Sequence, residues 1–314
     1  MEKIKIAVLL SGLTRYWEIT SKCFEYWNNF HDNVDYYFFI STWGEPTRAE
    51  KSTYARSPIK LPPSGFEKND FSKYPFLTKY EYINQEEFTM AEGKGNPNTQ
   101  YYAYSLYKCN ELRKSSGINF DGVIHTRTDI FIPKEIHSKI ISLFGCPKGA
   151  SKDFSPDKMQ NYKKNKVQPE MFFTTSGTTI ALAKPKNRFF INNDNFSFAH
   201  PLAMDKYANM YFDSYVHKKN PSTSLHSIQA EQLMLHRIYN SCMGGQTWLV
   251  RSEKLGLQKY GMPTSEDLEY VINTKGIDYL YNTEFVDLQK KYFSHDIGVN
   301  LIKSRNKNNE KVAT

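Results

Sequence analysis

The sequence contains few cysteines, and they form no pattern. The 314 residues include only Cys23, Cys109, Cys146 and Cys242, which are far apart and stand in no CxxC or Cys/His cluster. This spacing excludes a disulfide framework and a zinc site of the cysteine type. It indicates thiols that stay reduced, as they do inside the cell.

Long hydrophobic runs are also missing. No segment approaches the roughly 18 consecutive apolar residues that a membrane-spanning helix needs. The first residues, MEKIKIAVLLSG, contain a short apolar run that stops at a Ser-Gly pair, which is typical of a first strand rather than a signal peptide. We therefore expect a soluble, cytoplasmic protein without a transmembrane segment.

The charge is basic but dispersed. The formal net charge is +8 and the sequence pI is about 9.0. Such a balance attracts nucleic acid, anionic membrane surfaces or anionic small molecules such as nucleotide diphosphates. The lysines are scattered, however, and no RNP, zinc-finger or helix-turn-helix pattern accompanies them, so we expect no nucleic-acid partner.

Alternation of strand and helix patterns predicts an α/β fold. A continuous apolar run at 4–10 reads as a buried parallel strand, a helical pattern follows at 16–30, and a second strand pattern covers 34–40. A helix predicted at 101–114 leads into a strand at 123–132. We expect a central, mostly parallel sheet flanked by helices. Further along we predict a hairpin from strands at 171–175 and 179–183, a strand edge at 189–199, and helices at 134–144, 201–217 and 222–239.

The stretch DGVIHTRTDIFIP, residues 121–133, carries the strongest chemical signal. His125, Arg127 and Asp129 alternate, so on a strand their side chains would share one face. An imidazole, a guanidinium and a carboxylate on a buried strand are costly unless they pair or meet a ligand. Two interpretations stay open: a buried Arg–Asp pair that fastens the strand end, or a site for a charged ligand with a divalent metal on Asp129.

The ends of the first two strands are candidate parts of the same site. Ser11, Gly12 and Arg15 follow the first strand, and Thr42 and Trp43 close the second. Open α/β sheets bind ligands at the carboxyl ends of their strands. The Gly12 turn and Arg15 suit a phosphate, and an ordinary turn with a surface arginine is the alternative.

Several short motifs, in order along about 230 residues, resemble nucleotide-sugar glycosyltransferases of the GT-A kind. They are LLSGLTR (9–15), FFISTW (38–43), VIHTRTDIFIP (123–133), NDNFSFAH (193–200) and IQAEQLM (228–234). The chain is similar in particular to WavE-type enzymes of lipopolysaccharide synthesis. The resemblance implies one Rossmann-type, GT-A-like domain over residues 1–303, with a nucleotide-binding half at 1–133 and an acceptor half at 134–303. The polar segment 304–314 is predicted to be a disordered tail.

The resemblance also implies residue roles on the donor side. Asp129 would contact a divalent ion, Mn²⁺ or Mg²⁺, or the ribose and diphosphate of the donor. A full D-x-D motif would place an aspartate at position 127, where this chain has Arg127, so Arg127 in direct contact with the diphosphate is the alternative. The implied donor-binding residues are Ser11, Gly12, Arg15, Thr42, Trp43, His125, Arg127 and Asp129.

On the acceptor side, transfer with inversion needs a general base. Glu231 and Asp194 are the candidates. Glu231 could equally be an exposed helix glutamate, and Asp194 could bind a sugar hydroxyl or cap a helix. Asn193 and His200 are candidate acceptor-binding residues.

The expected activity is transfer of a hexose from a UDP- or GDP-sugar to a glycan or lipid-linked acceptor in surface polysaccharide synthesis. A second hypothesis is another Rossmann-like transferase such as a methyltransferase, but the glycine-rich first turn and the acidic residue after the second strand are missing. A third is a carbohydrate-binding protein without catalysis.

Overall fold

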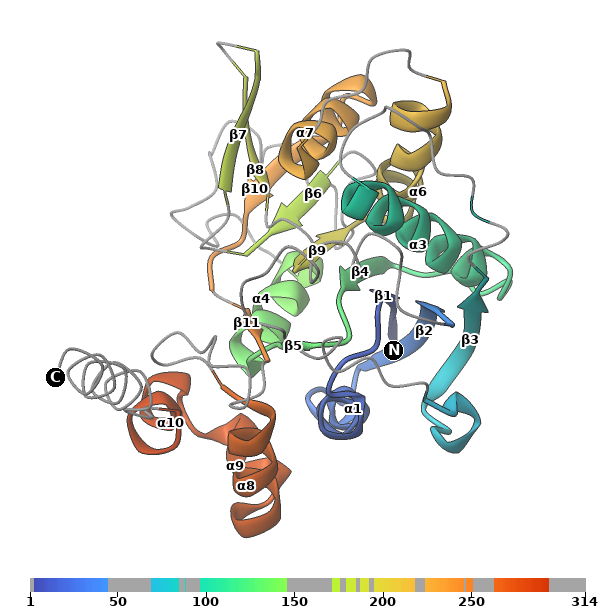
Figure 1. Ribbon diagram of the computed structural model, residues 1–314. Coiled ribbons are helices and arrows are strands. Elements are labelled where there is room, and N and C mark those ends of the chain that lie inside the picture. Colours follow the sequence, from blue (N-terminus) through green and yellow to red (C-terminus); the bar gives the residue numbers. More distant parts are fainter. Residues whose placement is uncertain are drawn as a thin grey trace, which may run out of the picture.

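The central feature of the computed structural model is a seven-stranded sheet with the order β10-β6-β9-β4-β1-β2-β3 (Figure 1). The structure describes residues 3–44, 69–84, 88, 97–145, 171–175, 179–184, 187–191, 195–217, 224–245, 247–250 and 263–293. The strands of this sheet are β1 (Ile4–Gly12), β2 (Val34–Trp43), β3 (Leu77–Ile83), β4 (Gly122–Thr126), β6 (Met171–Thr174), β9 (Phe196–Ala199) and β10 (Tyr239–Cys242). Only β9 runs against its neighbours, so the predicted mostly parallel α/β sheet is confirmed.

The sheet is buried on both faces because its central strands are apolar throughout. In β1, Ile6, Val8 and Leu10 belong to one hydrophobic core, whereas Ala7 and Leu9 belong to the other. All five side chains are fully buried. This two-sided burial is the physical origin of the unbroken apolar run in the sequence.

Helices cover the two faces in separate groups (Figure 1). One face carries α1 (Trp17–Tyr26), α4 (Lys134–Gly145), α8 (Ser265–Lys275), α9 (Ile277–Asn282) and α10 (Phe285–Lys291). The other carries α3 (Pro97–Lys114), α6 (Pro201–Ala208) and α7 (Leu225–Leu235). Short helices η1 (Trp27–Asn29), η2 (Phe71–Lys73) and the π-helix η4 (Phe212–Val216) complete the helical elements of the described chain. None of the described helices has both the length and the apolarity of a membrane span.

The strand order reverses between β1 and β4. The connection through α1 places β2 on one side of β1, and the connection through α3 places β4 on the other. The connection after β1 crosses one face of the sheet, and the connection that leads to β4 crosses the other face. Such a reversal opens a crevice at the carboxyl ends of the two strands, where α/β proteins bind ligands. The fold therefore directs attention to the ends of β1 and β4.

The strand predicted at 123–132 is interrupted at residues 127–129, within its polar stretch. Strand β4 ends at Thr126, a turn follows, and β5 (Ile130–Phe131) pairs with β11 (Trp248–Leu249) in a separate sheet. The Thr128 hydroxyl donates to the Leu13 carbonyl at 2.9 Å, and the Val250 N–H donates to the Asp129 carbonyl at 2.8 Å. These long-range bonds stabilise the turn, and the alternating pattern alone does not reveal them.

The predicted hairpin at 171–183 is wrong. Strand β6 joins the main sheet between β9 and β10, whereas β7 (Thr179–Lys184) pairs with β8 (Asn187–Ile191). The strand edge predicted at 189–199 is likewise two strands, β8 and β9. The predicted tail, 304–314, lies outside the described residues. The division at residue 133 into two functional halves stays a prediction.

A buried histidine makes one face of the core sensitive to acid. The ring centroid of His137 in α4 lies 4.3 Å from the ring centroid of Trp27 and 4.6 Å from that of Phe30. The Nδ1 of His137 is 3.1 Å from the Tyr36 hydroxyl. Burial, and then the neighbouring charge of His31, lower the pKa of His137 well below its usual 6.5. The folded protein therefore holds a neutral imidazole at this position.

We expect the free energy of unfolding to fall as the pH drops below about 6.5, because His137 then binds a proton in the unfolded chain but not in the folded protein. The loss is at most about 1.4 kcal/mol per pH unit and ends at the lowered pKa of the folded state. His137→Gln keeps a partner for Tyr36 but does not titrate. Urea unfolding of both proteins should show a shallower pH dependence for the variant, and equal slopes would contradict this assignment.

Candidate functional site

Two buried polar side chains join the carboxyl ends of β1 and β4. The Ser11 Oγ lies 2.9 Å from the His125 Nε2, and both residues are almost completely buried. The ring of Tyr102 from α3 meets the imidazole edge-on, with the ring centroids 5.7 Å apart. Three elements thus fix the orientation of His125 at the point where the strand order reverses.

A carboxylate with two guanidinium groups lies just beyond this pair. Arg127 donates to Asp129 through two parallel bonds, Nε to Oδ1 at 2.7 Å and Nη2 to Oδ2 at 2.8 Å. The Nη1 of Arg15 lies 3.6 Å from the same Oδ2. The Asp129 side chain is only 3% exposed, whereas those of Arg15 and Arg127 are 22% and 21% exposed. A buried anion therefore holds two partly exposed cations side by side.

The charge balance of this cluster favours an anionic ligand. Burial by itself would raise the pKa of Asp129, but the charge and hydrogen bonds of Arg127 and the charge of Arg15 outweigh it and hold the pKa below 3.8. Asp129 is therefore ionised at neutral pH. Counted over these three side chains alone, one negative and two positive groups give a formal charge of +1, and arginine can bind a phosphate in bidentate fashion.

The turn between β1 and α1 presents Arg15 to this cluster. Gly12 has φ +104°, which only glycine adopts readily, and Tyr16 has φ 53° just before α1 begins. These two positive φ values reverse the chain within five residues. Arg15 consequently lies at the amino end of α1, where the helix dipole adds positive potential.

The candidates at the end of β2 differ in their environment. The Thr42 Oγ1 is buried and has no hydrogen-bond partner among the described residues, so its hydroxyl keeps an unused donor and acceptor at the carboxyl end of β2. Trp43 is 1% exposed and its ring packs edge-on against Phe88 and Tyr101. The structure thus places Trp43 in the core, so its indole does not present a face for stacking.

Sequence reasoning missed a polar connection from α3 to α7. The Nε2 of Gln229 donates to the Tyr207 hydroxyl at 2.7 Å and to the Tyr102 hydroxyl at 3.4 Å. Gln229 is fully buried. In the sequence, Gln229 stands one helical turn from Leu225 and from Leu233, and this spacing is the signal that would have found it, since an amide on the apolar side of a helix needs partners. Tyr102 then connects this pair to the ring of His125.

Of the acceptor-side candidates, the structure places Glu231 and His200. Asn193 and Asp194 lie outside the described residues. Glu231 is half-buried in α7, two residues beyond Gln229 and so roughly 200° away around the helix from the side that reaches Tyr102. The structure therefore does not direct the Glu231 carboxylate toward His125 along with Gln229.

His200 lies at the other edge of the sheet. Strand β9 is antiparallel to β4, and Ala199 pairs with Val123 near the start of β4. The Nδ1 of His200 accepts the Leu202 N–H at 3.1 Å and caps α6. His200 also lines a pocket of about 720 Å³ with Lys3 and Asp121. It is thus separated from Asp129 by the length of β4.

The described residues do not fit a divalent metal at Asp129. Both carboxylate oxygens already face arginines, and the described part of the chain holds no group of three or more His, Cys, Asp or Glu side chains suited to a metal. Mg²⁺ and Mn²⁺ favour clusters of oxygen ligands over sites that contain two cations. The charges at this edge suit the phosphate itself better than a metal ion.

Removing the Ser11 hydroxyl should destabilise the fold. Ser11→Ala takes away a buried partner of His125, and we expect the free energy of unfolding to drop by about 1–3 kcal/mol in urea. Ser72→Ala, which deletes an exposed hydroxyl bonded to Asp70, should cost less than about 0.5 kcal/mol. Equal effects of the two substitutions would show that the Ser11–His125 contact does not contribute to the stability of the fold.

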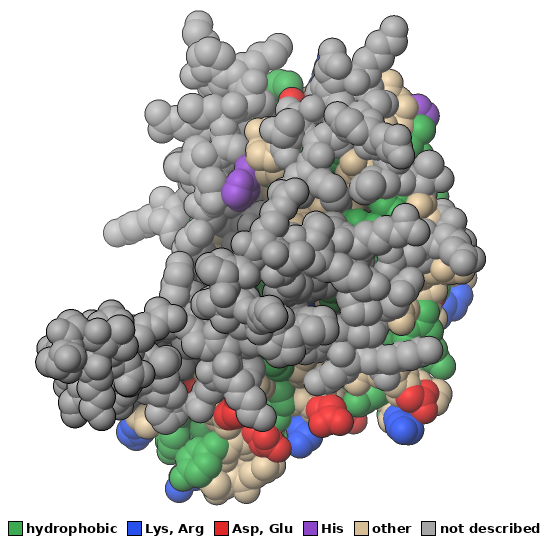
Figure 2. Space-filling model, in the orientation of Figure 1, with side chains coloured by type: hydrophobic (Ala, Val, Ile, Leu, Met, Phe, Trp, Pro, Cys, Tyr) green, Lys and Arg blue, Asp and Glu red, His purple; other side chains and the backbone are tan. Residues whose placement is uncertain are grey.

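Charged side chains elsewhere are mixed. On the face drawn in Figure 2, described acidic and basic side chains are interspersed along the lower rim. In that view the described residues gather no basic patch of the kind that binds a polyanion. The overall charge of +8 is thus not focused on the visible part of the described surface.

Comparison with known proteins gives structural likeness only. Neither the family models nor the curated proteins give a match. The fold is similar to a protein described as a nucleotide-diphospho-sugar transferase from Desulfovibrio desulfuricans G20, with 8% identity, TM-score 0.35, and coverage of 93% of this chain and 95% of that one. It is also similar to the galactosyltransferase LgtC in complex with donor and acceptor sugar analogues, with 9% identity, TM-score 0.31, and coverage of 74% of this chain and 70% of that one. A third similar structure is mouse xyloside xylosyltransferase 1, with 10% identity, TM-score 0.30, and coverage of 77% of this chain and 85% of that one. Likeness this distant does not decide an activity, which we argue from the site.

Proposed function

We propose that this protein is a glycosyltransferase that moves a sugar from a nucleoside-diphosphate donor to a glycan or lipid-linked acceptor. The observation that carries the proposal is the pair of partly exposed arginines, Arg15 and Arg127, held by buried Asp129 beside the ends of β1 and β4. This position is where an α/β sheet binds a nucleotide. Two guanidinium groups suit its diphosphate.

Arg15 and Arg127 would bind the diphosphate and stabilise it as it leaves. When the bond between the sugar and the diphosphate breaks, negative charge grows on the phosphate oxygens. Because Asp129 fixes Arg127 through two bonds, the guanidinium needs little reorganisation to meet that charge. Ser11, Gly12 and Thr42, at the ends of β1 and β2, would contact the rest of the nucleotide.

The acceptor hydroxyl would lose its proton to a carboxylate. Asp194 and Glu231 remain the proposed bases, and Asn193 the proposed acceptor contact. Asp194 follows β8 and precedes β9, whose first residues lie beside Thr126 at the proposed donor edge. Its position in the sequence, just before the strand that pairs with β4, supports Asp194 more than Glu231 as the proposed base.

The donor is a UDP- or GDP-sugar in this proposal, and the process is surface polysaccharide synthesis in the cytoplasm. The motifs that resemble WavE-type enzymes support this assignment. The arginine cluster supports a donor charge neutralised by the protein, in place of the Mn²⁺ or Mg²⁺ that the resemblance implies.

A ligand panel tests the proposal. The melting temperature is measured with UDP-glucose, UDP-galactose, GDP-mannose and S-adenosylmethionine, each with Mn²⁺ and with EDTA. A nucleotide sugar should raise the melting temperature, since a ligand that binds the folded state stabilises it by mass action, and should do so equally in EDTA. A rise in melting temperature with S-adenosylmethionine alone would support the methyltransferase hypothesis. A rise with a nucleotide sugar that requires Mn²⁺ would show that the donor site uses a metal ion.

A further inference from the structure

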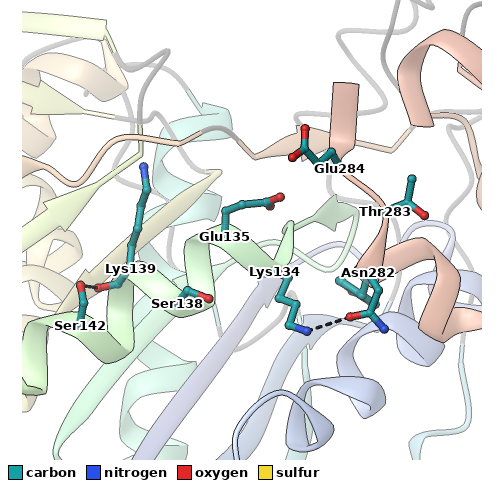
Figure 3. A pocket seen from close by; sticks show the side chains of 9 residues that line it. Lys134, Glu135, Ser138, Lys139, Ser142, Asn282, Thr283 and Glu284 are labelled. Atoms are coloured by element: carbon teal, nitrogen blue, oxygen red, sulfur yellow. Dashed lines mark hydrogen bonds between the residues drawn. The ribbon is translucent and has the colours of Figure 1, made fainter. Parts of the chain in front are cut away.

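A second concave site lies between α4 and the junction of α9 with α10. The crevice has a volume of about 540 Å³, within the range of about 300–1,000 Å³ that is usual for ligand pockets. Its lining includes Lys134, Glu135, Ser138 and Lys139 from α4, and Asn282 and Glu284 from the opposite wall. Figure 3 shows Glu135 reaching from α4 toward Glu284 across the open space.

The two walls are connected by one hydrogen bond and otherwise offer polar groups to the space between them. The Nζ of Lys134 donates to the Oδ1 of Asn282 at 2.8 Å (Figure 3). Within the described part of the chain, the side chains of Glu135, Lys139 and Glu284 enter no ion pair, although each carries a charge. The crevice therefore combines hydrogen-bond donors and acceptors that can turn to a ligand.

One wall of the crevice is rigid. Tyr281 is 4% exposed and stacks on Tyr26 with the rings 5.3 Å apart and 9° from parallel. Its hydroxyl donates to the Cys23 carbonyl at 3.4 Å. Because this wall is anchored on α1, a ligand that contacts it meets a preformed surface, which lowers the entropic cost of binding.

The charges of the lining cancel. Lys134 and Lys139 balance Glu135 and Glu284, and Glu135 lies between the two lysines in the sequence of α4. The lining as a whole therefore has no excess of one sign that would select a phosphate or a metal ion. Ligand hydroxyl groups both donate and accept, so they match an array of ammonium, carboxylate, amide and hydroxyl groups.

From this chemistry we infer that the crevice binds a neutral saccharide. The site is separate from the proposed donor site. Burial and then the charge of Lys134 lower the pKa of His31, so Lys134 lies near this residue, which precedes β2. The donor site lies at the far end of β2. Five extended residues from Asp129 to Lys134 span at most about 18 Å, a distance that a polymeric glycan can bridge.

The test uses the full chain and defined probes. Isothermal titration calorimetry measures maltotriose, cellotriose and N,N′-diacetylchitobiose, with inorganic phosphate and glycylglycine as ionic probes. At least one saccharide should bind, and Glu135→Ala and Lys139→Ala should each weaken it tenfold or more. Glu269→Ala and Lys22→Ala, exposed substitutions of matching charge on α8 and α1, should bind as the wild type does.

The assignment would be overturned if no saccharide binds, if the crevice variants bind as tightly as the wild type, or if phosphate or glycylglycine binds more tightly than every saccharide. The outcome is independent of the donor site. Nucleotide-sugar binding should be unchanged in Glu135→Ala, and saccharide binding unchanged in Arg15→Ala. If either variant loses both ligands, the saccharide and the nucleotide sugar share one site, which would contradict a separate crevice.

Discussion

Asp129→Ala should lower the free energy of unfolding by about 3 kcal/mol and abolish donor binding. The substitution removes the anion that pairs with Arg127 and Arg15, and breaking a buried ion pair by deleting one partner typically costs about 3–5 kcal/mol. The lower end applies because both arginines are about one-fifth exposed and water relieves part of the repulsion. Donor binding is lost because the carboxylate that positions the two guanidinium groups at the strand ends is gone.

Two controls separate charge from shape and burial from exposure. Asp129→Asn keeps the size of the side chain and one oxygen acceptor, so it should retain more stability than alanine. Asp35→Ala deletes the partner of Lys3 in a pair whose side chains are 52% and 37% exposed, and should cost less than about 1 kcal/mol. Urea unfolding gives the stabilities and calorimetry with UDP and GDP gives the affinities. If Asp129→Ala unfolds at the same urea concentration as wild type, the cluster does not stabilise the fold.

Protonation of Asp129 in acid should lower the free energy of unfolding as Asp129→Ala does, but to a smaller extent. The pKa of Asp129 is lower in the folded state than its usual 3.8, so its stabilisation is present above about pH 4 and is lost as the pH falls through the folded-state pKa. The His137 effect begins at a higher pH, near 6.5. Destabilisation by acid should therefore start with His137, and loss of the Asp129 contribution should add to it below about pH 4.

The parallel half of the fold was predictable because burial leaves a direct record in the sequence. Strand β1 is buried on both faces, so Ile6 to Leu10 is an unbroken apolar run, and the helical spacing of Trp17, Cys23 and Phe24 follows from one buried side of α1. Pairing between strands far apart in the sequence leaves no such record. The position of β6 beside β9 and the antiparallel pairing of β5 with β11 depend on contacts between distant segments of the chain, and both were missed.

The candidate site was predicted in composition but not in geometry. His125, Arg127 and Asp129 do gather at one edge, but Thr126 ends the strand, and His125 turns to Ser11 while Arg127 folds back onto Asp129. A turn that is fixed by Thr128 and Leu13, 115 residues apart, cannot be read from local alternation. The interpretation of a buried Arg–Asp pair and that of an anion site are thus compatible, because the carboxylate is buried and the guanidinium groups are partly exposed.

Arg127→Ala should weaken the binding of UDP or GDP by about 10- to 150-fold. A hydrogen bond to a charged group contributes about 1.5–3 kcal/mol, and each 1.4 kcal/mol is tenfold in affinity. Arg127→Lys keeps the charge but loses the planar fork that both Asp129 and a phosphate require, so its affinity should lie between those of alanine and wild type. Arg15→Ala tests the same site with less disturbance, because Arg15 contacts Asp129 only at 3.6 Å.

Calorimetry on variants first shown by circular dichroism to be folded measures these affinities. Arg237→Ala removes the same charge from an exposed position at the end of α7 and should bind UDP and GDP as the wild type does. Raising the salt concentration should weaken the wild type more than Arg127→Ala, since the wild type has more charge for the ions to screen. If Arg15→Ala and Arg127→Ala both bind the nucleotides normally while Asp129→Ala does not, the arginines serve the fold alone and the diphosphate is held elsewhere.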